Sequence, residues 1–258
     1  MAIKLAIGEE FFDSLRESGS YYVDKTGLIR DLVAANNTVS LFTRPRRFGK
    51  TLTMSMIHSF FDITRDSREV FKGLDVAAHE DFCKAWMNQY PVVFITLKDA
   101  EAIKFETAYA KLKTIIADVC KKHGFLGNSE NVNSADAEKF ARLVFETAGE
   151  QEIQNALLLL CRMLHDHYGK PVILLIDEYD VPLAKARDHG FYPQMLDVIR
   201  GLLSTSLKSN DYLKFAVITG CLRIAKESIF TGVNNFKSYS VVDEAFSQYF
   251  GFTEKEIN

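Results

Sequence analysis

The stretch LFTRPRRFGKTLTMSMIHSFFD, Leu41 to Asp62, contains the signal that decides the fold. A short apolar strand is expected over Thr38 to Thr43 and a helix over Lys50 to Phe61. Between them, the motif Gly49-Lys50-Thr51 matches the second half of a phosphate-binding loop. The glycine lets the backbone approach a phosphate, the lysine would reach the β- and γ-phosphates, and the threonine hydroxyl would coordinate Mg²⁺. A strand before the loop and a helix after it are the context that such a loop requires.

The first turn of this loop departs from the usual pattern. Arg44 stands where a glycine is usual, and Pro45, Arg46 and Arg47 follow it. Arginine and proline cannot make the tight turn in the way that glycine does, because proline fixes its own φ. We therefore expect Pro45 to set the turn, and Arg46 or Arg47 to replace lost backbone donors with side-chain charge. Taken alone, the motif also fits a basic loop that caps a sheet.

Two later strand ends carry complementary chemistry. VILLIDEYD, Val172 to Asp180, is an apolar strand that ends in Asp177-Glu178. An acid at such a strand end binds the Mg²⁺ shell, and a second carboxylate can polarise the attacking water. FAVITGCLR begins at Phe215; its Thr219 could bond the γ-phosphate or the water, and Arg223 could supply transition-state charge. The structural alternatives are a solvated turn for the two acids, a strand-end cap for Thr219 and a surface position for Arg223.

The alternation of strands and helices indicates the fold class. Besides the strands above, a strand is expected over Pro91 to Lys98, and Tyr239 to Val242 is a candidate fifth strand. Strands separated by helices predict a parallel sheet covered on both faces, which is a three-layer α/β/α sandwich. The order of the three strand ends is that of the P-loop NTPase type with an extra strand between the phosphate loop and the metal-binding strand (ASCE). Gly124 to Asn133 is the best candidate for a mobile loop. The remaining expected helices are Thr26–Ala35, Phe105–Lys122, Ala135–Glu146, Glu152–His167 and Tyr192–Leu207.

The bulk composition narrows the function classes. The net charge of the 258 residues is -3, which argues against a broadly basic nucleic-acid coat. The four cysteines include no CxxC pair, so neither a zinc site nor a disulfide framework is indicated. No signal peptide and no membrane-spanning apolar run is present in the sequence. We therefore expect a cytoplasmic protein with no membrane partner.

Five stretches together resemble the bacterial AAA-ATPase-like family, whose P-loop ATPase domains are often joined to a C-terminal nuclease-like domain of the PD-(D/E)XK type. They are YYVDKTGLI (21–29), RPRRFGKT (44–51), LIDEYDVPL (175–183), ITGCLRIAKESIFTGVNN (218–235) and FGFTEKEI (250–257). The resemblance implies that the arginine-rich loop is a family trait. It also implies that Tyr22, Asp24 and Lys25 lie near the adenine, although Asp24 is read here as a helix cap.

The resemblance assigns roles to individual residues. It implies an AAA-like form of the P-loop NTPase fold, ATP and Mg²⁺ as cofactors, catalytic roles for Lys50, Glu178 and Thr219, and metal ligation by Thr51 and Asp177. The catalytic role expected of Arg223 rests on its position after the strand and not on the resemblance. The implied nucleotide contacts come from the loop and the first turn of its helix, namely Arg46, Arg47, Phe48, Gly49, Lys50, Thr51 and Leu52.

The domain organisation follows from the same stretches. Residues 1–250 are expected to form the ATPase domain, and residues 251–258 the start of a helix or lid that is cut short. Thr253 and Glu256 fit a capping box at this helix start. We therefore expect a fragment of a longer protein, with the nuclease-like domain absent from it.

The predicted function is Mg²⁺-dependent ATP binding and hydrolysis, serving as a switch or motor for an attached effector. One alternative is a nucleotide-binding regulatory module with little turnover. Another is accessory binding of nucleic acid such as DNA through the basic cluster of Arg44, Arg46, Arg47 and Lys50. The sequence leaves the oligomeric state open.

Overall fold

The fold is built on a parallel five-stranded sheet in the order β2-β3-β4-β1-β5. The computed structural model describes residues 8–221, 229–230 and 232–257. In the sheet, β4 lies between β1 and β3, so all three predicted functional strand ends come from adjacent strands. The strands are β1 (Val39–Thr43), β2 (Val92–Thr96), β3 (Val172–Asp177), β4 (Leu213–Gly220) and β5 (Phe236–Tyr239).

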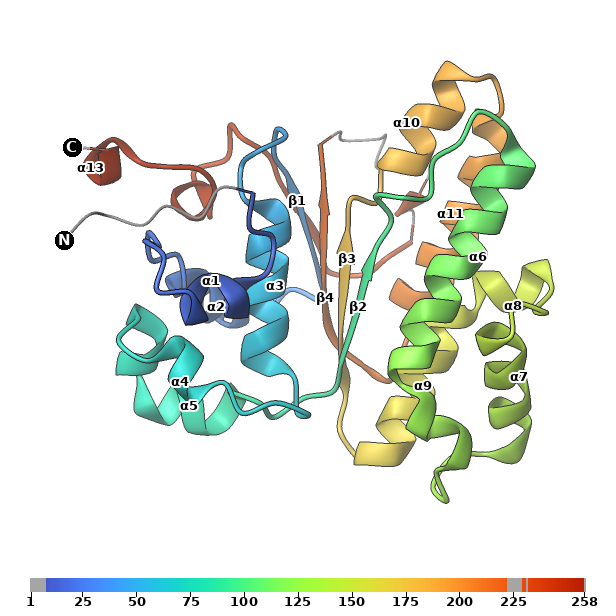
Figure 1. The fold of residues 1–258 in the computed structure, drawn as a ribbon, viewed down its shortest axis with the longest axis horizontal. Helices are drawn as coiled ribbons and strands as arrows, with labels where there is room; N and C mark the ends of the chain where they lie inside the picture. Colours follow the sequence, from blue (N-terminus) through green and yellow to red (C-terminus); the bar gives the residue numbers. More distant parts are fainter. Residues whose placement is uncertain (1–7, 222–228, 231, 258) are drawn as a thin grey trace.

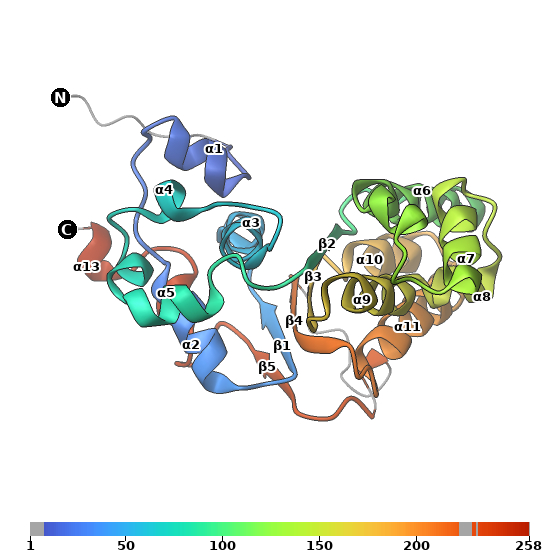
Figure 2. The ribbon, with the colours of Figure 1, turned by 90° about the horizontal axis from the view of Figure 1, so that it is seen from below.

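Helices cover both faces of this sheet, as Figures 1 and 2 show. One face carries α1 (Phe12–Glu17), α2 (Gly27–Ala35), α3 (Lys50–Phe61), α4 (Arg68–Phe71) and α5 (Glu80–Trp86), with the 3₁₀ helix η1 (Asp75–Ala78). The other carries α6 (Phe105–Lys122), α7 (Ser134–Val144), α8 (Glu150–Gln154), α9 (Ala156–Tyr168), α10 (Val181–Asp188) and α11 (Tyr192–Leu207), with η2 (Gly124–Asn128). After β5 come η3 (Ser247–Tyr249) and α13 (Glu254–Ile257). The predicted α/β/α sandwich of the P-loop NTPase type is confirmed.

The central strands are buried on both faces, which explains their uninterrupted apolar sequences. Leu174 and Ile176 of β3 belong to the core cluster under α6, α9 and α11. Ile173 and Leu175 belong to the cluster under α3. Successive side chains of a strand point to opposite faces, so a strand between two helical layers needs apolar residues at every position.

Three predicted elements differ from the structure. The single helix expected over 152–167 is broken at Asn155 into α8 and α9, where the Thr205 hydroxyl of α11 donates to the Gln154 carbonyl at 2.6 Å. The fifth strand precedes the expected stretch because it pairs with β1, from Val39 opposite Phe236 onwards. In the stretch expected to be a mobile loop, residues 124–128 form η2, whose Leu126 is buried.

No helix in the described part of the chain combines the length and the apolar character needed to cross a membrane.

Candidate functional site

The loop between β1 and α3 turns at two left-handed positions. Gly49 has φ 74° and Arg47 has φ 69°. A Cβ added at Gly49 would meet nothing within 4 Å, so the requirement for glycine there is the backbone conformation and not space. Gly49 ends the loop directly before the first residue of α3, and its carbonyl accepts the amide of Thr53 at 2.9 Å. The loop backbone therefore wraps the N-terminus of a 12-residue helix.

Arg44 fills the place of the missing glycine with a buried side chain. Its guanidinium donates to the carbonyls of Thr43 at 3.0 Å and Tyr239 at 2.8 Å. It also stacks over the ring of Phe250, with 4.8 Å from Cζ to the ring centroid. Burial lowers the pKa of Arg44, while the nearby Asp243 carboxylate raises it. Arg44 thus joins the phosphate-type loop to the chain that follows β5.

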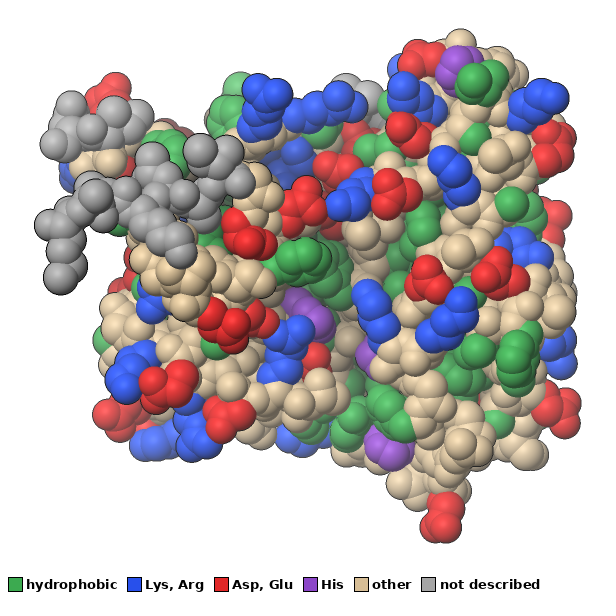
Figure 3. Space-filling model, in the orientation of Figure 1, with side chains coloured by type: hydrophobic (Ala, Val, Ile, Leu, Met, Phe, Trp, Pro, Cys, Tyr) green, Lys and Arg blue, Asp and Glu red, His purple; other side chains and the backbone are tan. Residues whose placement is uncertain are grey.

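The predicted basic cluster is wrong in part. Arg44 and Lys50 are only 2% and 5% exposed, whereas Arg46 and Arg47 are exposed and make no hydrogen bond or ion pair with any described residue. A surface for nucleic acid would therefore have two arginines here instead of four cations. Figure 3 shows basic side chains at the upper edge of the molecule, above the C-terminal ends of the strands.

Lys50 is a buried cation at the N-terminus of α3. Its Nζ donates to the carbonyls of Arg44 at 3.1 Å and Pro45 at 3.0 Å, and to Cys221 Sγ at 3.4 Å. Within the described residues, no carboxylate forms an ion pair with it. Buried ammonium groups are normally paired, and the N-terminus of a helix adds positive potential. The two together favour an anion at this place.

Asp177 brings two of the three predicted strand ends together with the loop. The carboxylate is fully buried, and it accepts the Thr51 hydroxyl on Oδ2 at 2.8 Å. Its Oδ1 accepts the hydroxyl of Thr219 from β4. The parallel register places the C-terminal ends of β1, β3 and β4 at one sheet edge, so these side chains meet although they are far apart in sequence.

Glu178 follows Asp177 in a strained backbone conformation. Its φ of 54° is rare for a residue with a Cβ, and such strain persists where the surrounding structure enforces it. Burial raises the pKa of Glu178, and so do the charges of Asp177 and Asp180. The cations of Lys50 and Lys98 oppose this shift. The carboxylate therefore holds a proton at a higher pH than an ordinary glutamate.

The end of β4 packs tightly against the residues after β3. Tyr179 donates its amide to the Thr219 carbonyl at 3.2 Å, and the amide of Cys221 donates to Asp180 Oδ2 at 3.0 Å. A Cβ added at Gly220 would lie 2.7 Å from Asp180 Oδ1 and from Tyr179 Cε1. Gly220 therefore permits the close approach that holds Asp177 and Glu178 in place. The sequence interpretation gave no role to Asp180 or Cys221, although they lie within the stretches VILLIDEYD and FAVITGCLR.

The remaining predicted residues of the loop and of the first turn of α3 line two cavities. Arg46 lines a cavity of about 230 Å³ together with Asp180, Cys221 and Glu101. Arg47, Phe48 and Leu52 line another cavity. Arg223 lies outside the described residues.

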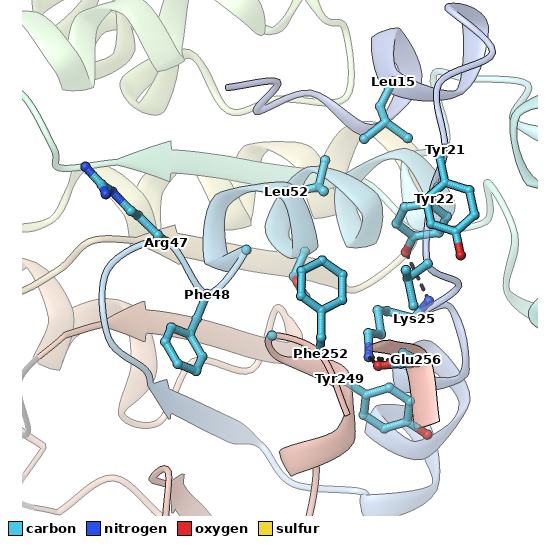
Figure 4. A pocket seen from close by; sticks show the side chains of 14 residues that line it. Leu15, Tyr21, Tyr22, Lys25, Arg47, Phe48, Leu52, Tyr249, Phe252 and Glu256 are labelled. Atoms are coloured by element: carbon cyan, nitrogen blue, oxygen red, sulfur yellow. Dashed lines mark hydrogen bonds and ion pairs between the residues drawn. The ribbon is translucent and has the colours of Figure 1, made fainter. Parts of the chain in front are cut away.

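That second cavity, of about 550 Å³, adjoins Gly49 and the first turn of α3. Figure 4 shows its two walls, which come from opposite ends of the chain. Tyr21, Tyr22 and Lys25 line it from the N-terminal motif, whereas Tyr249, Phe252 and Glu256 line it from the end of the chain. The sequence predicted the start of a helix or lid over residues 251–258, but not that this segment forms the second wall of the cavity. In the expected capping box, Glu256 Oε2 accepts the Thr253 amide at 2.7 Å.

The N-terminal motif, Tyr21 to Lys25, packs against α3 and η1 beside the cavity. The Tyr22 hydroxyl donates to Met56 Sδ of α3 at 3.3 Å, and burial raises the Tyr22 pKa. The role expected of Asp24 as a helix cap is wrong. Its carboxylate accepts the amides of Thr26 at 2.8 Å and Asp75 at 2.7 Å, so it orders the turn before α2 and ties that turn to η1.

The oxygen donors at the strand ends fit one divalent cation that is shared with a phosphate. Thr51 and Asp177 offer a hydroxyl and a carboxylate. Among the described residues, no group of three or more His, Cys, Asp or Glu side chains forms a metal cage. Mg²⁺ typically binds through one or two protein oxygens plus substrate phosphates.

Comparison with known proteins agrees with this geometry. The AAA-ATPase-like family, described as predicted AAA-ATPases, matches residues 6–230. An uncharacterized protein in the vnfD 5' region of Azotobacter chroococcum mcd 1 is 31% identical over 265 residues, covering 99% of this chain and 44% of that protein. The chain thus spans less than half the length of this relative. The chain belongs to the AAA-ATPase-like family.

Proposed function

We propose that this member of the predicted AAA-ATPase family binds ATP with Mg²⁺ and hydrolyses it, as a switch or motor for an attached effector. The observation that carries the proposal is the buried Lys50 ammonium at the N-terminus of α3, which donates to the Arg44 and Pro45 carbonyls and forms no ion pair with any described residue. The β- and γ-phosphates would take over the contacts that Lys50 now makes with loop carbonyls. The loop amides and the helix N-terminus would complete the cradle.

The metal is assigned to the Thr51 hydroxyl and the Asp177 carboxylate, whose 2.8 Å hydrogen bond already brings the two oxygens together. When bound, Mg²⁺ supplies charge neutralisation on the phosphates. Thr219 fixes the orientation of Asp177 from the other side through its hydroxyl. We assign Arg46 and Arg47, which are exposed on the loop, to binding the negative charge of the phosphates. We assign Phe48 and Leu52 to contacts with the nucleotide at the edge of the site.

Glu178 is assigned as the general base. Water attacks the γ-phosphorus in line, the bond to the β–γ bridging oxygen breaks, ADP leaves, and the water proton passes to the Glu178 carboxylate. The raised pKa of Glu178, caused by burial and by Asp177, suits this role, because a base works best when its pKa approaches the operating pH.

A titration with Mg²⁺-ATP tests the binding site. We expect Lys50→Ala to weaken binding roughly ten- to hundredfold, as the loss of charge-assisted hydrogen bonds implies. The matched control is Lys122→Ala, an exposed lysine at the end of α6, which should bind like wild type. Equal affinity of Lys50→Ala and wild type would refute the site.

Turnover separates an ATPase from a nucleotide-binding regulatory module with little turnover. The substitution of the loop's first glycine by Arg44 is the feature that favours the module. If the protein is an ATPase, Glu178→Gln should keep Mg²⁺-ATP binding and lower phosphate release about 10²- to 10⁴-fold. Tight ATP binding by wild type without phosphate release would decide for the module.

A further inference from the structure

The chain after β5 returns to the phosphate-type loop and packs on it. We call residues 246–257 the C-terminal segment. The Phe250 ring lies 5.2 Å from the ring of Phe42 in β1 and 4.8 Å from the Arg44 guanidinium. Gly251, with φ 73°, lies so close that an added Cβ would be 3.3 Å from Cδ1 of Phe48. A shift of the loop therefore moves groups that touch the segment at two places.

Lys25 holds the other end of the same segment. Its Nζ lies 2.7 Å from both carboxylate oxygens of Glu256 and 2.7 Å from the Gln248 carbonyl. Lys25 is 8% exposed, so this ion pair is screened less than a surface pair. Although burial raises the pKa of Glu256, hydrogen bonds from Lys25 and Thr253 lower it overall, and the carboxylate is charged at neutral pH. The pair joins the two walls of the 550 Å³ cavity.

The cavity is lined by aromatic rings that the fold leaves partly uncovered. Phe252 is 68% exposed, Tyr21 56% and Phe48 37%. Figure 4 shows Phe252 from the C-terminal segment directed towards Leu52, between Phe48 and the tyrosines. Exposed aromatic side chains around a concave site favour a flat ring as ligand, because ring stacking adds to the burial of apolar area. Gly49 of the loop and Leu52 and Thr53 of α3 also line this cavity, so a ligand in the cavity can be continuous with one on the loop.

We propose that the C-terminal segment is a clasp for the nucleobase: the base packs against Phe252, and the Lys25–Glu256 ion pair keeps the segment closed on it. This inference rests on the proposed function, because it places the base of the same nucleotide. Base occupancy and closure of the segment then stabilise each other by the same free energy. Lys25 and Glu256 are positioning residues, since they act through the segment.

Two ligands separate the base from the phosphates, namely Mg²⁺-ATP and Mg²⁺-tripolyphosphate, which has no base. We expect Glu256→Gln to weaken ATP binding about tenfold, the effect of a partly buried ion pair, and to leave tripolyphosphate binding unchanged. Lys25→Met should weaken ATP binding at least as much, because it also loses the hydrogen bond to the Gln248 carbonyl, and the double variant should be no weaker than Lys25→Met, because the ion pair is already lost there. The matched control is Glu244→Gln, an exposed glutamate before the segment.

Hydrogen exchange of wild type adds a measurement that needs no variant. ATP should slow amide exchange in residues 247–257, and tripolyphosphate should not. Equal protection by both ligands would overturn the clasp while the proposed function stands. So would an equal loss of affinity for ATP and for tripolyphosphate in Glu256→Gln. Failure of wild type to bind either ligand would overturn the proposed function and the clasp with it.

Discussion

Arg44→Gly restores the glycine of the usual phosphate-loop pattern, and we expect it to destabilise this protein. The variant loses two hydrogen bonds, to the carbonyls of Thr43 at 3.0 Å and Tyr239 at 2.8 Å. It also loses the contact of the guanidinium with the Phe250 ring at 4.8 Å. Glycine makes no replacement contact, and it increases the entropy of the unfolded chain.

The magnitude follows from these contacts. Hydrogen bonds from a charged donor contribute about 1.5 kcal/mol each at the low end, and the ring contact about 1 kcal/mol. Removing the cost of burying the guanidinium offsets roughly 2 kcal/mol of this sum. The glycine contributes a further loss of about 0.5–1 kcal/mol. We expect a net loss of roughly 2–3 kcal/mol in the free energy of unfolding, which lowers Tm by about 4–12 °C for a domain of this size.

Urea unfolding, followed by the fluorescence of Trp86, the single tryptophan, measures this loss. The matched control is Arg46→Gly, because Arg46 is exposed and makes no hydrogen bond or ion pair with any described residue. It carries the same glycine effect without the buried contacts, so it should lose only about 0.5–1 kcal/mol. If Arg44→Gly is as stable as Arg46→Gly, the structural role assigned to Arg44 is wrong.

The remaining predictions concern the strand ends. Lys98→Gln removes a cation that lowers the pKa of Glu178, so the acid limb of the kcat/KM profile for ATP should move to higher pH; an unmoved limb contradicts Glu178 as the base. Gly220→Ala forces a Cβ into the chain after β3 and should lower the free energy of unfolding by roughly 1–3 kcal/mol in urea; a wild-type midpoint would show that the contact relaxes freely. Thr51→Val removes the hydroxyl that bonds Asp177, so half-maximal phosphate release should need more Mg²⁺, and an unchanged Mg²⁺ dependence would exclude Thr51 as a ligand.

Local patterns were enough to predict the helices whose signals lie within their own residues. The bounds predicted for α3, α6 and α11 coincide with those in the structure. Their apolar faces recur at the helical period, and they adjoin residues that end a helix or start a loop. The break at Asn155 was not predictable in this way, because the donor that bonds the Gln154 carbonyl is Thr205, 51 residues away.

In the candidate site, too, some features were predictable from local patterns and others were not. That Thr51, Asp177 and Thr219 meet was predictable, because parallel strands bring their C-terminal ends to one edge. The burial of Arg44 was not predictable, because the loop sequence does not determine whether its guanidinium faces solvent or β5. For Arg223, the predicted catalytic role stays a prediction.

The sequence by itself determined which chemical groups stand at each strand end and that those ends share one edge, because both depend on local apolar runs and on parallel pairing. Only the tertiary structure decided the second wall of the cavity and the burial of Arg44. Lys25 and Glu256 are 231 residues apart, and no local preference in either stretch predicts their contact. Their pairing depends on where β5 places the chain that follows it, and the place of β5 is set by its pairing with β1.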